Sequence, residues 1–127
     1  MKSKQLLWAM TLGLIVFSGM QLFSGGIDAK AAQSMKQQGA LLLDVREPEE
    51  FSAVHVQDAK LIPLGELEAR LPEIATYKDR PIVVMCRSGH RSARAVSLLK
   101  EAGYSQVSNI KGGITAWEKD GLQVIRL

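Results

Sequence analysis

The sequence predicts an α/β domain with a central parallel sheet of four or five strands, helices on both faces, and a hydrophobic helix at the amino terminus. Two short apolar runs carry this prediction, residues 41–43 (Leu-Leu-Leu) and 82–85 (Ile-Val-Val-Met), which are uninterrupted as strands buried on both faces are. Each run ends in polar residues, and the second is followed by apolar residues at helical spacing, so strands alternate with helices. We expect residues 1–26 to be a hydrophobic segment with a short linker and residues 27–127 to be the domain.

The amino-terminal segment contains an apolar run, residues 6–23, that follows two lysines. This run is longer than the roughly 7–15 residues of a signal-peptide core and approaches the length that spans a bilayer. Cleavage at the Ala-Lys-Ala sequence of residues 29–31 would cut a helix predicted over residues 29–38, so we favour an uncleaved membrane anchor. Because the lysines precede the span, the domain is expected on the periplasmic side. Export followed by cleavage near residues 24–26 is the alternative.

The other elements are predicted from apolar periodicity and from the residues that begin or end helices. Asp28 suits the cap of the helix over residues 29–38, Gly39 its end, and Pro48 the first position of a short helix. Further along the chain we expect a short strand at residues 61–62, a helical core stripe over 64–74 broken by Pro72, a helix from after Ser92 to Gly103, a strand at 106–110, and a closing helix with Trp117 in the core.

The single cysteine of the chain, Cys86, lies between the strand of residues 82–85 and the helix that follows it. Open α/β sheets place their functional sites at this edge. Between Cys86 and Arg91 the backbone has to curl with successive N–H groups pointing inward, and Gly89 supplies the conformational freedom for this curl. These amides, the positive end of the helix, and the charges of Arg87 and Arg91 favour a thiolate. We therefore expect Cys86 to be a nucleophile rather than an inert core cysteine.

The loop sequence Cys-Arg-Ser-Gly-His-Arg-Ser, residues 86–92, resembles the active-site loop of the rhodanese family of sulfurtransferases. Four residues separate its cysteine from Arg91, whereas protein tyrosine phosphatases have five, and Ser92 occupies the place of the phosphatase arginine. The resemblance implies a rhodanese-like fold and a loop that holds a sulfane sulfur on Cys86 as a persulfide.

Two further blocks resemble signatures of the same family, so that the resemblance extends over residues 27–127. Residues 43–51 (Leu-Asp-Val-Arg-Glu-Pro-Glu-Glu-Phe) resemble the first signature, and residues 109–114 with the tryptophan that follows resemble the last, where paired glycines let the backbone pass close to the active loop. The family usually has glycine at the places of Val54 and Asp58, so the backbone of this connecting turn is expected to differ. His55 in the same turn is expected to be structural.

The expected reaction is transfer of a sulfane sulfur from a small donor such as thiosulfate to Cys86, and from there to cyanide or a thiol. The backbone amides of the loop should hold the charge of the outer sulfur. Behind the loop, Asp44 and Arg46 could steady it, contact the substrate, or form an ordinary ion pair at a strand end. The site residues are therefore Cys86 as the catalytic nucleophile, Arg87 at the rim, Ser88, Gly89, His90 and Ser92 in the substrate-binding loop, Arg91 as its lock, and Asp44 and Arg46 behind it.

Several classes of function are disfavoured by the composition. One cysteine and two histidines at unrelated spacings predict neither a metal site nor a resident cofactor. The net charge is +3, and two of the positive charges belong to the lysines before the apolar run, so nucleic-acid binding is not expected. With no second cysteine, the sulfur acceptor must be external, and it could be a protein. The alternatives are a non-catalytic rhodanese-like persulfide carrier or binding module and, less favoured, a cysteine-dependent phosphatase or arsenate reductase.

Overall fold

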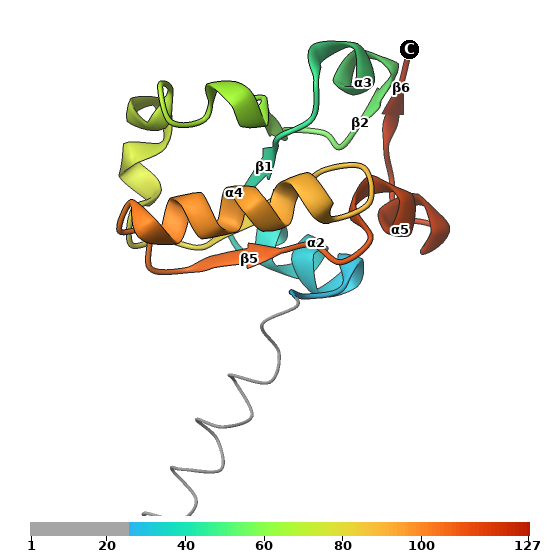
Figure 1. Cartoon of the computed structure of the whole chain (residues 1–127). Helices are drawn as coiled ribbons and strands as arrows, with labels where there is room; N and C mark the ends of the chain where they lie inside the picture. The colour runs from blue at the N-terminus through green and yellow to red at the C-terminus, as the bar shows by residue number, and fades with distance from the viewer. Residues whose placement is uncertain (1–25) are drawn as a thin grey trace, which may run out of the picture.

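The computed structural model describes residues 26–127, and its centre is a four-stranded parallel sheet (Figure 1). The strand order is β3 (Lys60–Leu61), β1 (Leu41–Asp44), β4 (Ile82–Met85), β5 (Val107–Asn109). All four side chains of β4 are buried, which explains its uninterrupted apolar sequence. The predicted α/β fold with a parallel sheet is confirmed, with four strands.

Helices cover both faces of the sheet, and alternate side chains of β4 separate the two cores (Figure 1). On one face, Val83 and Met85 share a cluster with α2 (Ala29–Gln37) and α5 (Gly113–Lys119). On the other, Ile82 and Val84 share a cluster with α4 (His90–Glu101) and with the 3₁₀ helices η1 (Leu64–Glu66) and η2 (Leu71–Tyr77). The period of two along a strand therefore builds both cores from one short run.

The first helix follows the predicted capping. The Asp28 carboxylate accepts a hydrogen bond from the backbone N–H of Ala31 at 2.7 Å, which satisfies one of the free donors at the start of α2. Gly39 lies just beyond the helix with a φ of +105°. The proposed anchor at residues 6–23 and most of its linker lie outside the described residues, and the division of the chain at residue 27 stays a prediction. Within residues 26–127, no helix is long and apolar enough to cross a membrane.

Three predicted elements differ from the structure. Residues 64–74 do not form one helix, because η1 and η2 are separate 3₁₀ segments, although Leu67 and Ile74 are buried as expected. Pro72 lies in the first turn of η2, where a proline without an N–H costs no hydrogen bond, and so it begins a helix rather than breaking one. The predicted strand at 61–62 is shifted by one residue, as β3 shows. The main helix begins at His90, before Ser92, so the loop itself is shorter than predicted.

The connecting turn after α3 (Pro48–Ala53) pairs with the end of the chain. Its strand β2 (Val54–His55) runs antiparallel to β6 (Ile125–Arg126), a pairing that the sequence analysis missed. Asp58 has a φ of +65°, a left-handed conformation that glycine favours and that aspartate tolerates better than most residues. His55 stacks on the Phe51 ring, with Nδ1 2.8 Å from the Phe51 carbonyl oxygen, in a structural role.

Candidate active site

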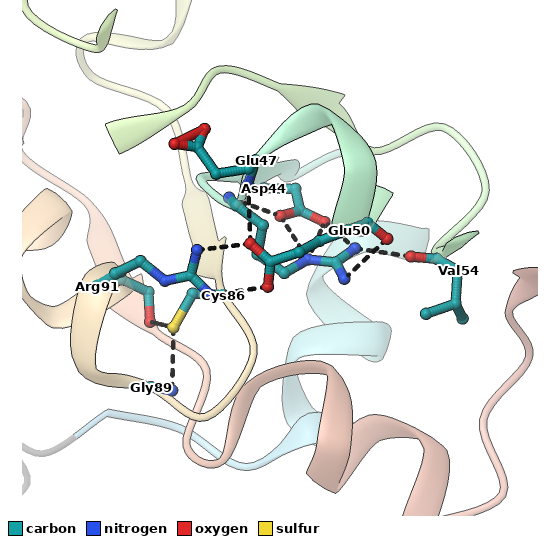
Figure 2. Close-up of polar contacts among 9 residues, drawn as sticks. Asp44, Glu47, Glu50, Val54, Cys86, Gly89 and Arg91 are labelled. Atoms are coloured by element: carbon teal, nitrogen blue, oxygen red, sulfur yellow. Dashed lines mark hydrogen bonds and ion pairs between the residues drawn. The ribbon is translucent and has the colours of Figure 1, made fainter. Parts of the chain in front are cut away.

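The sulfur of Cys86 lies inside a short loop between β4 and α4, surrounded by hydrogen-bond donors (Figure 2). The backbone N–H of Gly89 points at Sγ from 3.0 Å, and the hydroxyl oxygen of Ser92 lies 3.3 Å from it. Gly89 has a φ of +110°, which turns its N–H inward, and a residue with a side chain would be strained there. Cys86 is only 1% exposed, so the thiol is held within the loop rather than presented on the surface.

Opposing influences set the pKa of Cys86. Burial is the strongest of them and raises the pKa, because it penalises the charged form. The Ser92 hydroxyl and the backbone N–H groups of Ser92, Gly89 and Ser88 all stabilise the thiolate, and together they bring the pKa below its ordinary value. The loop therefore favours ionisation through fixed dipoles, as an oxyanion hole does for oxygen.

The amino-terminal end of α5 presses directly against the carbonyl side of the loop. The N–H of Ile114 donates to the Cys86 carbonyl at 2.9 Å, and the N–H of Thr115 donates to the Arg87 carbonyl at 3.3 Å. A Cβ on Gly113 would lie 2.3 Å from the Cys86 carbonyl oxygen and 2.6 Å from that of Arg87. The close approach that the resemblance implied for the paired glycines is therefore present. Because α5 fixes the carbonyl groups of Cys86 and Arg87, it also fixes the orientation of these two peptide groups.

Arg91 fastens the other side of the loop to α3. Its guanidinium donates two hydrogen bonds to the Glu50 carboxylate, at 2.7 and 2.9 Å, across 41 residues of sequence (Figure 2). Fork-to-fork pairs of this kind fix geometry as well as charge. Arg91 therefore ties the first turn of α4 to the helix that follows β1.

Asp44 and Arg46 form a buried ion pair one layer behind the loop. Their side chains are 0% and 2% exposed, and the Arg46 guanidinium donates to the Asp44 carboxylate at 2.8 Å. The same guanidinium donates to the carbonyls of Glu50 at 3.3 Å and Val54 at 2.8 Å, at the end of α3. Burial excludes the alternative of an ordinary surface pair, although Arg46 also borders a cavity that opens beside Arg87. The pair instead holds α3, and through Glu50 it supports Arg91.

The remaining loop side chains lie at the rim. Arg87, Ser88 and His90 are exposed, and His90 begins α4. A cavity of about 250 Å³ opens beside Arg87, between α3 and α5. Its walls include Glu50, Val54, Ile114, Thr115 and Glu118. Among residues 26–127 there is no group of three or more histidine, cysteine or acidic side chains that could hold a metal ion.

Two residues of the site were missed by the sequence analysis, Glu50 and Asn109. Nothing in the spacing of Glu50 connects it to Arg91, because a tertiary contact brings them together. Asn109 offered a weak signal, since it is a polar residue at the carboxyl end of a strand next to β4. In the structure its side chain contacts both Ser92 and Gly89.

Replacing Glu50 by glutamine should lower the free energy of unfolding by about 1 kcal/mol at neutral pH, a value reduced for the partial exposure of the pair. The pKa of Glu50 is lowered from 4.5 to about 2, and the largest cause is its hydrogen bonding to the Arg91 guanidinium. Because this pKa is lower in the folded chain, the stabilisation is complete above pH 4.5 and is lost as the pH falls toward 2. Urea denaturation of the wild type and the variant between pH 7 and pH 2.5 measures the difference.

The control for this measurement is Glu49→Gln, which removes an exposed carboxylate from the same helical turn. Glutamine at position 50 keeps an oxygen to accept from the Glu47 N–H, which donates to Glu50 at 3.0 Å in the wild type. A stability difference that is the same at pH 2.5 as at pH 7, or equal for both variants, would contradict a specific role for the Glu50–Arg91 pair.

Comparison with known proteins places this geometry in context. Residues 28–120 match the family model of the rhodanese-like domain. A protein of Allochromatium vinosum named sulfurtransferase is 41% identical over 85 residues, which cover 67% of this chain and 78% of the relative. Among solved structures, a rhodanese-related protein from Thermoplasma volcanium superposes with a TM-score of 0.70 at 31% identity, covering 79% of this chain and 96% of that one.

A thiosulfate sulfurtransferase from Pseudomonas aeruginosa is also similar, with a TM-score of 0.64 at 32% identity. The match covers 68% of this chain and only 17% of that much longer protein. The common unit among these proteins is therefore a domain of the size described here.

Proposed function

The chain belongs to the rhodanese family, and on that basis we propose that it transfers a sulfane sulfur from a donor such as thiosulfate, through a persulfide on Cys86, to a thiol or cyanide. The observation that carries the proposal is the set of donors around Sγ, the Gly89 N–H at 3.0 Å and the Ser92 hydroxyl at 3.3 Å. These donors favour a thiolate, which is the form of cysteine that attacks sulfur.

The reaction has two displacement steps. In the first, a lone pair of the Cys86 thiolate attacks the outer sulfur of thiosulfate, the S–S bond of the donor breaks, and its electron pair leaves with sulfite. In the second, the acceptor attacks the outer sulfur of the persulfide, and the bond to Sγ breaks to restore the thiolate. Cyanide would leave as thiocyanate, and a thiol acceptor as its persulfide. Neither step requires an oxidant or a general base.

The surroundings of Cys86 suit both partners of this exchange. Exposed Arg87 adds a positive charge at the rim, which attracts an anionic donor. The outer sulfur of a persulfide would carry the negative charge near the mouth of the loop, where the amides of Ser88 and Gly89 face it. Because Cys86 is the single cysteine of the chain, the acceptor must come from another molecule, either a small thiol or a protein.

The full-length chain tests the proposal when it is incubated with thiosulfate and analysed by intact mass spectrometry. We expect a gain of one sulfur atom, lost again on addition of cyanide with release of thiocyanate. Hydrolysis of an aryl phosphate without sulfur transfer would overturn the proposal in favour of the phosphatase alternative. Stable loading without transfer to cyanide or to small thiols would instead favour a persulfide carrier.

For the location of the chain, the proposal is that residues 6–23 anchor it with the domain on the periplasmic side of the membrane. The support is the length of the apolar run and the lysines before it. Membrane fractionation of the full-length chain, with sequencing of its mature amino terminus, distinguishes an anchor from a cleaved export signal. A mature chain that begins near residues 24–26 in the soluble fraction would contradict the anchor.

A further inference from the structure

A closed ring of hydrogen bonds joins the Cys86 sulfur to Ser92, Asn109 and Gly89, and Asn109 is the member with no role in the reaction described above. The Ser92 hydroxyl donates to the Asn109 side-chain oxygen at 2.6 Å and lies 3.3 Å from Sγ. The Asn109 side-chain nitrogen donates to the Gly89 carbonyl at 3.2 Å, and the Gly89 N–H donates to Sγ at 3.0 Å. The orientation of the amide follows from this ring, since the opposite one would set the Asn109 oxygen against the Gly89 carbonyl.

The hydroxyl of Ser92 has one proton and two acceptors within reach. A serine hydroxyl can donate once, so a strong bond to Asn109 excludes a strong bond to the sulfur at the same moment. When Cys86 is a neutral thiol, its S–H can donate to the Ser92 oxygen while Ser92 donates to Asn109. The thiol, the hydroxyl and the amide oxygen then each have a hydrogen-bond partner. When Cys86 is a thiolate, the Ser92 proton stabilises it only by leaving Asn109.

We propose that Asn109 competes with the Cys86 sulfur for the hydroxyl proton of Ser92, holding the proton when Sγ is uncharged and releasing it when the thiolate forms. Asn109 is then a positioning residue that acts through Ser92. A persulfide resembles the thiol in this respect, because its negative charge lies on the outer sulfur and not on Sγ. Asn109 therefore favours the thiol and the loaded persulfide over the empty thiolate, which limits how far the loop can lower the pKa of its own nucleophile. This role deepens the proposed sulfur transfer and rests on it.

The charged groups near the loop do not compete for this proton, because they are engaged elsewhere or point outward. They are Arg91 with its partner Glu50, the buried pair Asp44 and Arg46 under α3, and the exposed side chains of Arg87, His90 and Lys111. Cys86 is thus the titratable member of the ring, and the direction of the Ser92 hydroxyl decides which acceptor receives its proton.

Titration of Cys86 by its rate of alkylation with iodoacetamide, on the full-length chain from pH 5 to pH 10, tests the competition. This readout needs no sulfur transfer, so its failure is distinguishable from failure of the proposed function. Asn109→Ala should shift the midpoint down by about one pH unit, since the Ser92 proton is then free for the sulfur. Below both midpoints the alkylation rate should rise by up to about tenfold. Ser92→Ala should shift the midpoint up.

Two comparisons separate this role from a merely structural one. In a Ser92→Ala background, the further change Asn109→Ala should leave the midpoint unmoved, because no shared proton remains. Asn109→Asp loses the same donor to the Gly89 carbonyl as Asn109→Ala, and it should shift the midpoint up, both because it accepts the Ser92 proton more strongly and because its negative charge opposes the thiolate. Equal shifts for the alanine and aspartate variants would overturn the proposal. So would an alanine shift that persists without Ser92. If the double variant does not fold, a midpoint for Asn109→Ala that is equal to or above that of the wild type would overturn the proposal.

Discussion

Replacing Cys86 by serine should abolish sulfur loading and reduce transfer from thiosulfate to cyanide by about a thousandfold or more. A serine hydroxyl is close in size to a thiol, but it is not ionised near neutral pH and cannot form a transferable persulfide. Removing the nucleophile of a covalent mechanism typically costs this much or more in turnover. Intact mass spectrometry after incubation with thiosulfate and a thiocyanate assay measure the two effects.

The same experiment needs evidence that the variant folds. Urea denaturation of Cys86→Ser should give a midpoint close to that of the wild type, because the Gly89 N–H and the Ser92 hydroxyl retain a hydrogen-bonding partner at position 86. Ser97→Ala, on the exposed side of α4, serves as a control that should load sulfur as the wild type does. Loading that persists in Cys86→Ser would show that the sulfur is carried elsewhere and would contradict the assignment of Cys86.

The position of Cys86 in the fold could be predicted from the sequence because local patterns are sufficient to locate it. An apolar run of strand length, a cysteine at its end and a glycine three residues later place Cys86 at the carboxyl edge of a parallel sheet. The cap of α2 at Asp28 and the start of α3 at Pro48 depend equally on local chemistry, and the structure contains both. The close approach at Gly113, which the resemblance to the rhodanese family implied, is also present.

The polar support of the loop could not be predicted in the same way. Arg91 was expected to add its charge to the loop, and Cys86 is among the charges that raise the pKa of Arg91. Its guanidinium is also committed to Glu50, and the groups that donate hydrogen bonds to Cys86 and lower its pKa are a hydroxyl and backbone amides. The partner of Arg91 is 41 residues away, and only packing of α3 against the loop brings it there. Burial of Arg46 likewise depends on hydrogen bonds to the carbonyls at the end of α3. The spacing of apolar residues in the sequence gives no sign of these bonds.

Elements without strong periodicity were the least predictable part of the fold. The 3₁₀ segments η1 and η2 bury Leu67 and Ile74 at a spacing that also fits an α-helix, so the apolar pattern did not distinguish the two. Strand β6 is two residues long and its side chains are exposed, so it lacks the alternation that would reveal it. Its pairing with β2 is a contact between distant parts of the chain. In addition, an ion pair between Arg126 and Glu118 connects β6 to α5.

Replacing Gly113 by alanine should lower the free energy of unfolding by about 3–4 kcal/mol and slow sulfur transfer about a hundredfold. Part of the stability loss comes from the φ of +55°, which disfavours any side chain by about 1 kcal/mol or more. The larger part comes from contact, since the new methyl group would lie 2.3 Å from the Cys86 carbonyl oxygen and 2.6 Å from that of Arg87, and both carbonyls belong to the backbone. The loop would have to move away from α5, and the inward N–H of Gly89 would move with it. Urea denaturation and the thiocyanate assay measure the two losses.

Gly121→Ala is the matched control, because Gly121 also has a positive φ, +77°, but nothing within 4 Å of the position a Cβ would take. It should cost about 1 kcal/mol of stability from backbone strain alone and leave the transfer rate unchanged. The difference between the two variants isolates the contact between α5 and the carbonyl groups of Cys86 and Arg87. If Gly113→Ala cost no more than Gly121→Ala, or if it kept full activity, α5 would not be what holds the loop in its reactive shape. The geometry around Cys86 would then have to be maintained from the α4 side alone, through Arg91 and Glu50.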